Sequence, residues 1–296
     1  MVLGRAGSRN SDHLGTQWLG YAIQLMTKEL PPTMVHPHFR SAIYYNYGCR
    51  LHQLKQYSNA FEAFHEAVSI HRTLVVNDPA NHNFYLAQTL MNMGIALDAI
   101  GKYDDAIVAY KEVLEICTTM STRDPLRYNE LIVRALLNYG VALEGSNQVS
   151  EAAVMAKQAI SLVRDLAQTG KECTIWLCDA LHNYGHSCAL LGQPAEAVLA
   201  YQEAITLQRA IAETDSEAEN RLMLTLHHIA HSFRTLDKYS EGNTAATEFL
   251  ERNHGRVLED CGYAPDFSGC FVCQRGIIPD SPRNVSPPFP PTAGWS

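Results

Sequence analysis

The sequence predicts an all-α, α-α superhelical solenoid of five helix pairs plus a leading half-repeat. One residue pattern recurs at a fixed spacing, and the apolar residues inside each copy have helical spacing. The last residue of a three-residue anchor advances by 46, 46, 45 and 45 positions between copies. The anchors are Asn46-Tyr47-Gly48, Asn92-Met93-Gly94, Asn138-Tyr139-Gly140, Asn183-Tyr184-Gly185 and His228-Ile229-Ala230. Repeats of this size bury their apolar faces by stacking on one another.

The second copy shows why each repeat should be two antiparallel helices. Leu90, Met93 and Leu97 share one helical face, and Gly101-Lys102-Tyr103 then interrupts the pattern. A second apolar face follows, centred on Tyr110. The equivalent interruptions in the other copies fall in register, so we expect a short turn inside every pair.

The repeats divide the chain into four parts. We expect a disordered arm over residues 1–13, a half-repeat helix over 14–38, the repeats over 39–253, and a cysteine-containing, proline-rich tail over 254–296. The five repeats span 39–83, 84–127, 128–172, 173–217 and 218–253. Because the array begins with a lone second helix, either a leading helix caps it differently or the chain is a piece of a longer array.

Composition narrows the class of partner and the compartment. A net charge of −8 argues against nucleic acid, which needs a basic face. No window approaches the roughly 18 uninterrupted apolar residues of a membrane span, and the first residues lack the apolar core of a signal peptide. The eight cysteines show no disulfide-like spacing, which is typical of a reducing compartment. We therefore expect a cytoplasmic protein, with the nucleus as the alternative.

The repeated motif resembles the tetratricopeptide repeat. In the first copy the matching residues are Tyr44, Tyr47-Gly48, Leu51, Ala60, Phe64 and Ala67. The usual period is 34 residues, so the 45 or 46 residues found here predict longer helices. This variety is similar to the repeats of kinesin light chains and of many fungal proteins. The resemblance implies a non-enzymatic scaffold that binds a protein or a linear peptide.

The resemblance also implies which residues face a ligand. Residues three before, two before, one after and four after each anchoring glycine would line a groove along the first helices. Two before the glycine stands a ladder of amides able to bond the main chain of an extended peptide: Asn46, Asn92, Asn138 and Asn183. The other groove candidates are Tyr45, Met91, Leu137, His182, His186, His227, His228, His231 and Arg234. Alternatively, the asparagines hydrogen-bond a neighbouring helix and only set the superhelical pitch.

Two groups of residues have the chemistry of metal ligands. His182 with His186, and His227 with His231, are pairs four residues apart that could chelate a divalent metal or make the groove respond to pH. Alternatively, duplication copied one polar position twice. In the tail, a zinc site could use His254, Cys261, Cys270 and Cys273. A loosely packed hydrophobic cap followed by disorder is the favoured interpretation of the tail, and we expect no metal and no cofactor.

Two other functions compete with the scaffold. The array could be the sensing arm of a larger signalling ATPase, although the chain has no phosphate-binding loop of its own. It could also be an enzyme using the histidines or tail cysteines, but no set of nucleophile, base and acid supports that function.

Overall fold

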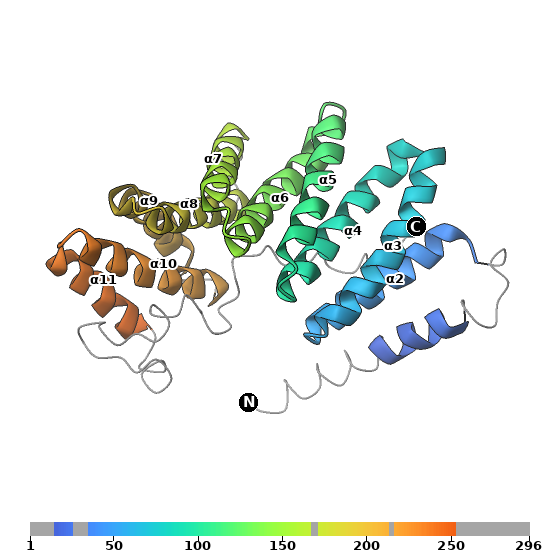
Figure 1. The fold of residues 1–296 in the computed structure, drawn as a ribbon, viewed down its shortest axis with the longest axis horizontal. Coiled ribbons are helices and arrows are strands. Elements are labelled where there is room, and N and C mark those ends of the chain that lie inside the picture. The colour runs from blue at the N-terminus through green and yellow to red at the C-terminus, as the bar shows by residue number, and fades with distance from the viewer. Residues whose placement is uncertain (1–14, 26–34, 167–170, 213–215, 253–296) are drawn as a thin grey trace. The chain divides into compact units, whose positions relative to one another are not determined.

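The computed structural model describes residues 15–25, 35–166, 171–212 and 216–252, and within these ranges all regular structure is helical (Figure 1). The helices are α2 (Pro37–Gln53), α3 (Tyr57–Asn77), α4 (Pro79–Ala99), α5 (Tyr103–Ser121), α6 (Pro125–Gly145), α7 (Val149–Asp165), α8 (Lys171–Leu190), α9 (Pro194–Ala212), α10 (Ser216–Thr235) and α11 (Tyr239–Arg252). Residues 15–24 form a further short helix. The all-α solenoid prediction is confirmed.

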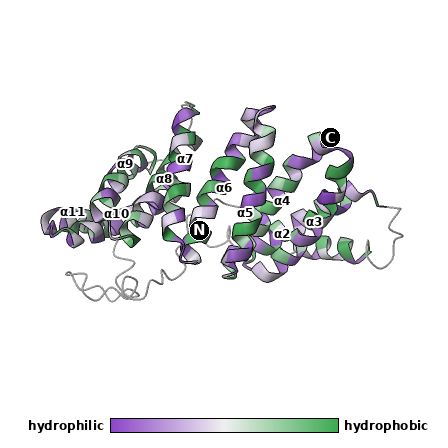
Figure 2. Cartoon of the chain, turned by 45° about the horizontal axis from the view of Figure 1, so that its top comes forward, coloured by the Kyte–Doolittle hydropathy of each residue, from purple (hydrophilic) through white to green (hydrophobic). Residues whose placement is uncertain are grey.

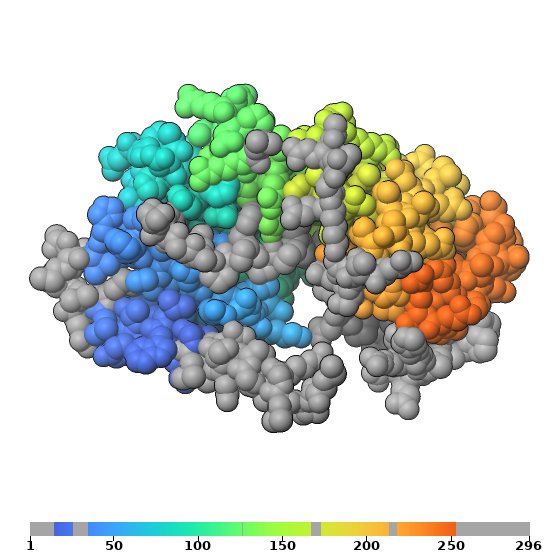
Figure 3. All heavy atoms as spheres, turned by 180° about the vertical axis from the view of Figure 1, so that it is seen from behind, coloured from blue at the N-terminus to red at the C-terminus, as the bar shows by residue number. Residues whose placement is uncertain are grey.

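The chain divides between Ser146 and Asn147 into two units. Unit 1 contains α2 to α6 and unit 2 contains α7 to α11. Inside each unit every helix packs on the next one in chain order, so the coloured bands of the space-filling view follow one another within a unit (Figure 3). The first helices also touch each other, α2 with α4 and α4 with α6 in unit 1, and α8 with α10 in unit 2. We call these helices the first-helix layer of each unit.

The turn inside each pair has the same backbone conformation. One residue per turn takes a positive φ, and these residues are Lys55, Gly101, Asn147, Gly192 and Asp237. In four of the turns the next amide donates to a carbonyl five residues earlier, as Gln56 does to Leu51. This is the hydrogen-bond pattern of a Schellman helix end. The turn therefore recurs with the period of the sequence.

The anchoring glycine marks the closest approach of the two helices in a pair. A Cβ added at Gly48 would lie 2.6 Å from the ring of Phe64, and one at Gly94 would lie 2.6 Å from Tyr110. In unit 2 the same contact joins Gly185 to Tyr201, at 2.7 Å. The three aromatic rings are fully buried, so glycine is required to let the ring lie against the helix backbone.

The long period comes from long helices, because α4 and α6 each contain 21 residues. A single residue separates α3 from α4, and its Asp78 carboxylate accepts a hydrogen bond from the Asn81 amide. Pro79 occupies the first turn, where it needs no amide hydrogen. Asp124 and Pro125 begin α6 in the same way. Each Asp-Pro pair thus starts a helix within one to three residues of the previous one, ahead of the predicted boundaries at 84 and 128.

Hydrophobic and hydrophilic residues alternate along every helix, as expected for helices packed on both sides (Figure 2). The short helix over residues 15–24 lies against α2, since a Cβ at Gly20 would sit 3.6 Å from the Tyr47 hydroxyl. No helix of the described ranges is long and apolar enough to cross a membrane. The predicted arm and tail, including His254, Cys261, Cys270 and Cys273, lie outside the described residues.

Candidate interaction surfaces

The asparagine ladder of unit 1 joins neighbouring first helices. The Asn92 Nδ2 donates to the Tyr45 hydroxyl at 3.2 Å and to the Cys49 sulfur at 3.6 Å. The Asn138 Nδ2 lies 3.5 Å from the sulfur of Met91. Both asparagines are fully buried. This arrangement favours the alternative in which the amides link helices, and their contact with a peptide stays a prediction.

The apolar groove candidates of unit 1 are part of the packed first-helix layer. Tyr45, Met91 and Leu137 are all buried. Two charged side chains are buried beside them: Asp98 on α4 and Arg134 on α6. The Arg134 guanidinium lies 3.4 Å from the Glu130 carboxylate, one turn away on α6. Of the remaining ladder positions, Asn46 is partly exposed and Asn183 is buried.

In unit 2 the first-helix layer carries a cluster of five histidines. His182 and His186 come from α8, while His227, His228 and His231 come from α10. The ring of His228 stacks on both α8 rings, with centroids 5.1 Å apart in each case and interplanar angles of 30° and 22°. The sequence pattern predicted equivalent faces for the two histidine pairs, and the structure stacks His228 with both His182 and His186.

The tautomer of His182 follows from its hydrogen bonds. The Thr225 hydroxyl donates its single proton to the carbonyl oxygen of Arg221. It must therefore accept a hydrogen bond from His182 Nδ1, which lies 2.9 Å away. A neutral His182 then carries its proton on Nδ1 and leaves a lone pair on Nε2. The Nε2 is the atom that a proton would reach.

Three members of the cluster, His182, His227 and His228, have pKa values below the ordinary value for histidine. Burial, followed by repulsion from His186, lowers the pKa of His182 to about 3. Burial, followed by repulsion from His231, lowers the pKa of His227 to about 4. Burial and then the other four histidines hold the pKa of His228 well below its ordinary value. Burial therefore favours the uncharged form of these three imidazoles.

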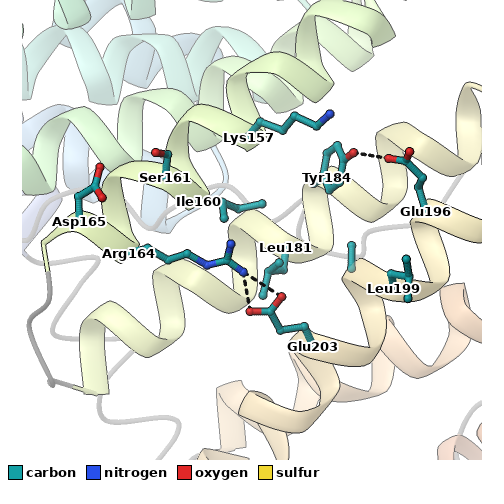
Figure 4. Close-up of a pocket in the computed structure, with 11 residues that line it drawn as sticks. Lys157, Ile160, Ser161, Arg164, Asp165, Leu181, Tyr184, Glu196, Leu199 and Glu203 are labelled. Carbon is teal, nitrogen blue, oxygen red and sulfur yellow. Dashed lines mark hydrogen bonds and ion pairs between the residues drawn. The ribbon is translucent and has the colours of Figure 1, made fainter.

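The second helices of unit 2 form a separate surface with an open pocket of about 560 Å³ (Figure 4). Its apolar lining includes Ile160 from α7 and Leu181 from α8. Most of its charges are paired, because Arg164 holds both oxygens of Glu203, at 2.7 and 2.9 Å. The Tyr184 hydroxyl donates to Glu196 at 2.6 Å.

Two charged residues of the pocket lining, Lys157 and Asp165, have no ion-pair partner among the described residues. The Lys157 ammonium lies 4.9 Å from the centre of the Tyr184 ring. The sequence does not indicate this pocket, because interleaved charges on a helix are typical of an ordinary solvated face.

The described residues supply no ready metal site or activated thiol. No group of three or more histidine, cysteine or acidic side chains among them could hold a metal ion. The five cysteines in these ranges are free, and burial raises the pKa of Cys49, Cys117 and Cys178 to about 12. Thiols in this state are poor nucleophiles at neutral pH.

Comparison with protein-family models matches the tetratricopeptide repeat at residues 41–73, 86–120 and 179–211. A comparison with curated protein sequences found no match.

Several solved structures have a similar fold. BtubC (BKLC) from P. vanneervenii has a TM-score of 0.63 at 13% identity, over 87% of this chain and 93% of that one. A putative kinesin light chain of Podosopora anserina with nearly identical TPR-like repeats has a TM-score of 0.56 at 17% identity, over 76% and 97%. A Rap protein complexed with competence and sporulation factor has a TM-score of 0.54 at 15% identity, over 84% and 66%.

Proposed function

Because the chain is a tetratricopeptide repeat protein, we propose that it is a non-enzymatic scaffold binding a peptide or partner protein along its first helices. The structures of similar fold support this role at the level of architecture, and the Rap protein was solved with a bound factor. Fold alone does not determine a partner. The proposal therefore depends on how this chain uses its own first helices.

The observation that carries the proposal is a contrast between fixed and varied positions. The contact of glycine with an aromatic ring is the same in both units, at Gly94 with Tyr110 and Gly185 with Tyr201. The first-helix positions near the anchoring glycines differ: unit 1 has amides and apolar residues, whereas unit 2 has imidazoles together with the amide of Asn183. Side chains that vary on a constant frame are the ones available to specify a ligand.

The free cysteines fit a reducing compartment, so we also place the protein in the cytoplasm. Fractionation of cells expressing the tagged chain would test this location.

Photo-crosslinking tests the binding surface directly. Benzoylphenylalanine would be introduced at Asn46 on α2 or at His231 on α10, with Val108 on the second helix α5 as the matched control. Val108 is 65% exposed, so it reports on partners of the opposite layer. We expect the same partner to crosslink from positions 46 and 231 and not to crosslink from position 108. Crosslinking from Val108 alone would move the binding surface to the second helices and contradict the proposal.

A further inference from the structure

We propose that the groove between α7 and α9 in unit 2 is a second interaction surface, which takes an amphipathic helix of a partner protein. The partner helix carries an acidic residue facing Lys157, a basic residue facing Asp165, and apolar residues between them. This inference goes beyond the proposed function, because it concerns second helices and not the first-helix layer. Either surface can be wrong without affecting the other.

The groove is built from helices alone. Both α7 and α9 pack on α8, and the ion pair of Arg164 with Glu203 joins them across the groove (Figure 4). Main-chain groups inside a helix already bond one another, so these walls offer an extended peptide no main-chain ladder. A helix satisfies its own main chain and can enter a groove with side chains alone. The architecture of the groove therefore favours a helical partner.

The groove contains apolar surface that a partner would remove from water. Leu199 of α9 lines it and is 68% exposed. Ile160 of α7 and Leu181 of α8 line the same groove and are buried. A pocket for a small molecule encloses most of its ligand, whereas this one is open, and an amphipathic helix needs cover on only one face. The apolar lining therefore suits a helix better than a small ligand.

Two acidic groups of the lining are already countered. The ion pair across the groove takes up Glu203. Glu196 accepts the Tyr184 hydroxyl at 2.6 Å and lies in the first turn of α9, where the helix dipole stabilises an anion. Within the described ranges, Lys157 and Asp165 are the lining charges that show neither an ion pair nor a side-chain hydrogen bond. These two charges are the ones available to a partner.

The positions of the two charges set the spacing on the partner. Lys157 and Asp165 lie eight residues apart on α7, which is about 12 Å along the helix axis. Asp165 is the last residue of α7, where the helix dipole disfavours its negative charge and favours a nearby cation. An acid and a base eight residues apart on a partner helix match this pair. Apolar residues three, four and seven positions after the acid share the same face.

The charge pair is particular to α7 among the second helices in register with it. Lys157 and Asp165 stand 17 and 25 residues after Gly140. The same two positions carry His65 and Thr73 in α3, Lys111 and Thr119 in α5, and Gln202 and Ala210 in α9. Side chains that differ on a repeated frame are available to select a ligand. The combination of base and acid therefore distinguishes this groove from its equivalents.

Anisotropy titrations of the full chain with labelled, blocked helical peptides test the proposal. All peptides share one leucine stripe, and the two flanking positions carry glutamate and lysine, glutamate twice, lysine twice, or glutamine twice. We expect the glutamate–lysine peptide to bind the unaltered chain most tightly, by about fivefold per charge over the glutamine peptide at low salt. High salt should narrow the difference. Equal binding of all four peptides, or tightest binding of a peptide with two like charges, would overturn the inference.

Charge-reversal variants assign the effect to the groove. Lys157→Glu should make the lysine–lysine peptide the preferred one, whereas Asp165→Lys should make the glutamate–glutamate peptide preferred. Lys111→Glu is the matched control, because Lys111 occupies the same register position and also faces an aromatic ring, that of Tyr139 at 5.7 Å. It should leave all four affinities unchanged. If either reversal in α7 left the preferred peptide unchanged, the inference would be wrong.

A last pair of variants tests the apolar contact. Leu199→Ser should weaken binding of the glutamate–lysine peptide by about tenfold, while Val108→Ser, at the equivalent position on α5, should not. Circular dichroism would confirm that the variants are folded. A second copy of the chain in the groove would appear as a dimer in sedimentation, and loss of that dimer in Leu199→Ser would overturn the inference. If the peptides fail while crosslinking from positions 46 and 231 succeeds, the scaffold role stands and only the second surface is wrong.

Discussion

The two units use the same register position for different chemistry. In unit 1, Asn92 and Asn138 each lie two residues before an anchoring glycine. Each contacts the residue three before the preceding anchoring glycine, which is Tyr45 for Asn92 and Met91 for Asn138. In unit 2 the equivalent pair is His228 and His182, and their rings stack instead of sharing a hydrogen bond. An amide contact does not titrate, whereas an imidazole contact does. One repeat geometry therefore gives amide contacts that do not titrate in unit 1 and imidazole contacts that do titrate in unit 2.

Acidification should produce the largest difference in stability between the two units. The pKa of His182 is about 3 and that of His227 is about 4, both below the unfolded value near 6.5. The unfolded chain therefore binds more protons below pH 6.5, so stability is complete above that pH and falls as the pH drops towards 4. Each such histidine removes at most about 1.4 kcal/mol per pH unit.

Hydrogen exchange at pH 7 and pH 5, corrected for the intrinsic rate, would show which helices lose stability on acidification. We expect protection to fall more in α8 and α10 than in α4 and α6. Unit 1 also holds a buried histidine, His71, whose pKa is lowered to about 4, so its loss should be smaller and not zero. An equal loss in both units would contradict the comparison.

Substitution of the anchoring glycines tests the glycine–aromatic contact that the two units share. Gly94→Ala and Gly185→Ala would each place a Cβ within 2.7 Å of a buried tyrosine ring. We expect each to reduce the free energy of unfolding by about 1–3 kcal/mol in urea denaturation. The sign is informative, because Gly→Ala inside an unhindered helix stabilises by roughly 0.5–1 kcal/mol. Stabilisation at either position would mean that the close contact is absent there.

Removal of a ladder amide tests the unit 1 half of the comparison. Asn92→Ala would take one buried hydrogen bond from the Tyr45 hydroxyl, and we expect a loss of about 1–2 kcal/mol that is the same at pH 6 and pH 8. Asn59→Ala, at an exposed position on α3, is the control and should change stability by less than about 0.5 kcal/mol. A loss that varied with pH would show that the ladder is coupled to a titrating group.

Ion pairs between second helices should contribute least to the free energy of unfolding. Arg72 pairs with Glu112 in unit 1 at 2.7 Å, and Arg164 pairs with Glu203 in unit 2 at 2.7 Å. Both arginines are more than half exposed, so Arg72→Gln and Arg164→Gln should each cost no more than about 1 kcal/mol. Thermal unfolding at low and high salt would measure the effect, which salt should diminish. A larger loss in one unit would reveal a further difference between them.

The repeat period predicted the helix pairs because spacing and packing are tied together by the Gly48 contact with Phe64 and its equivalents. Spacing could not show how far a neighbouring first helix would cover Asn92 or Met91, since helical periodicity gives a direction and not the distance to the next helix. The ion pairs could have been found from the sequence. Arg164 and Arg209 precede Glu203 and Glu248 by the same 39 residues.

The glycine–aromatic contact also bears on how such an array evolves. Both members lie inside one repeat, so duplication of a whole repeat copies the large ring together with the small residue that accommodates it. A new copy therefore inherits a working helix pair, and its first helix can change at once. Where the ring is lost the need for glycine ends: in the fifth repeat Ala246 stands at the aromatic position and Ala230 at that of the glycine, and both are buried. The two positions would thus be inherited together in such a duplication, although the third repeat keeps Gly140 with Ala156 at the aromatic position.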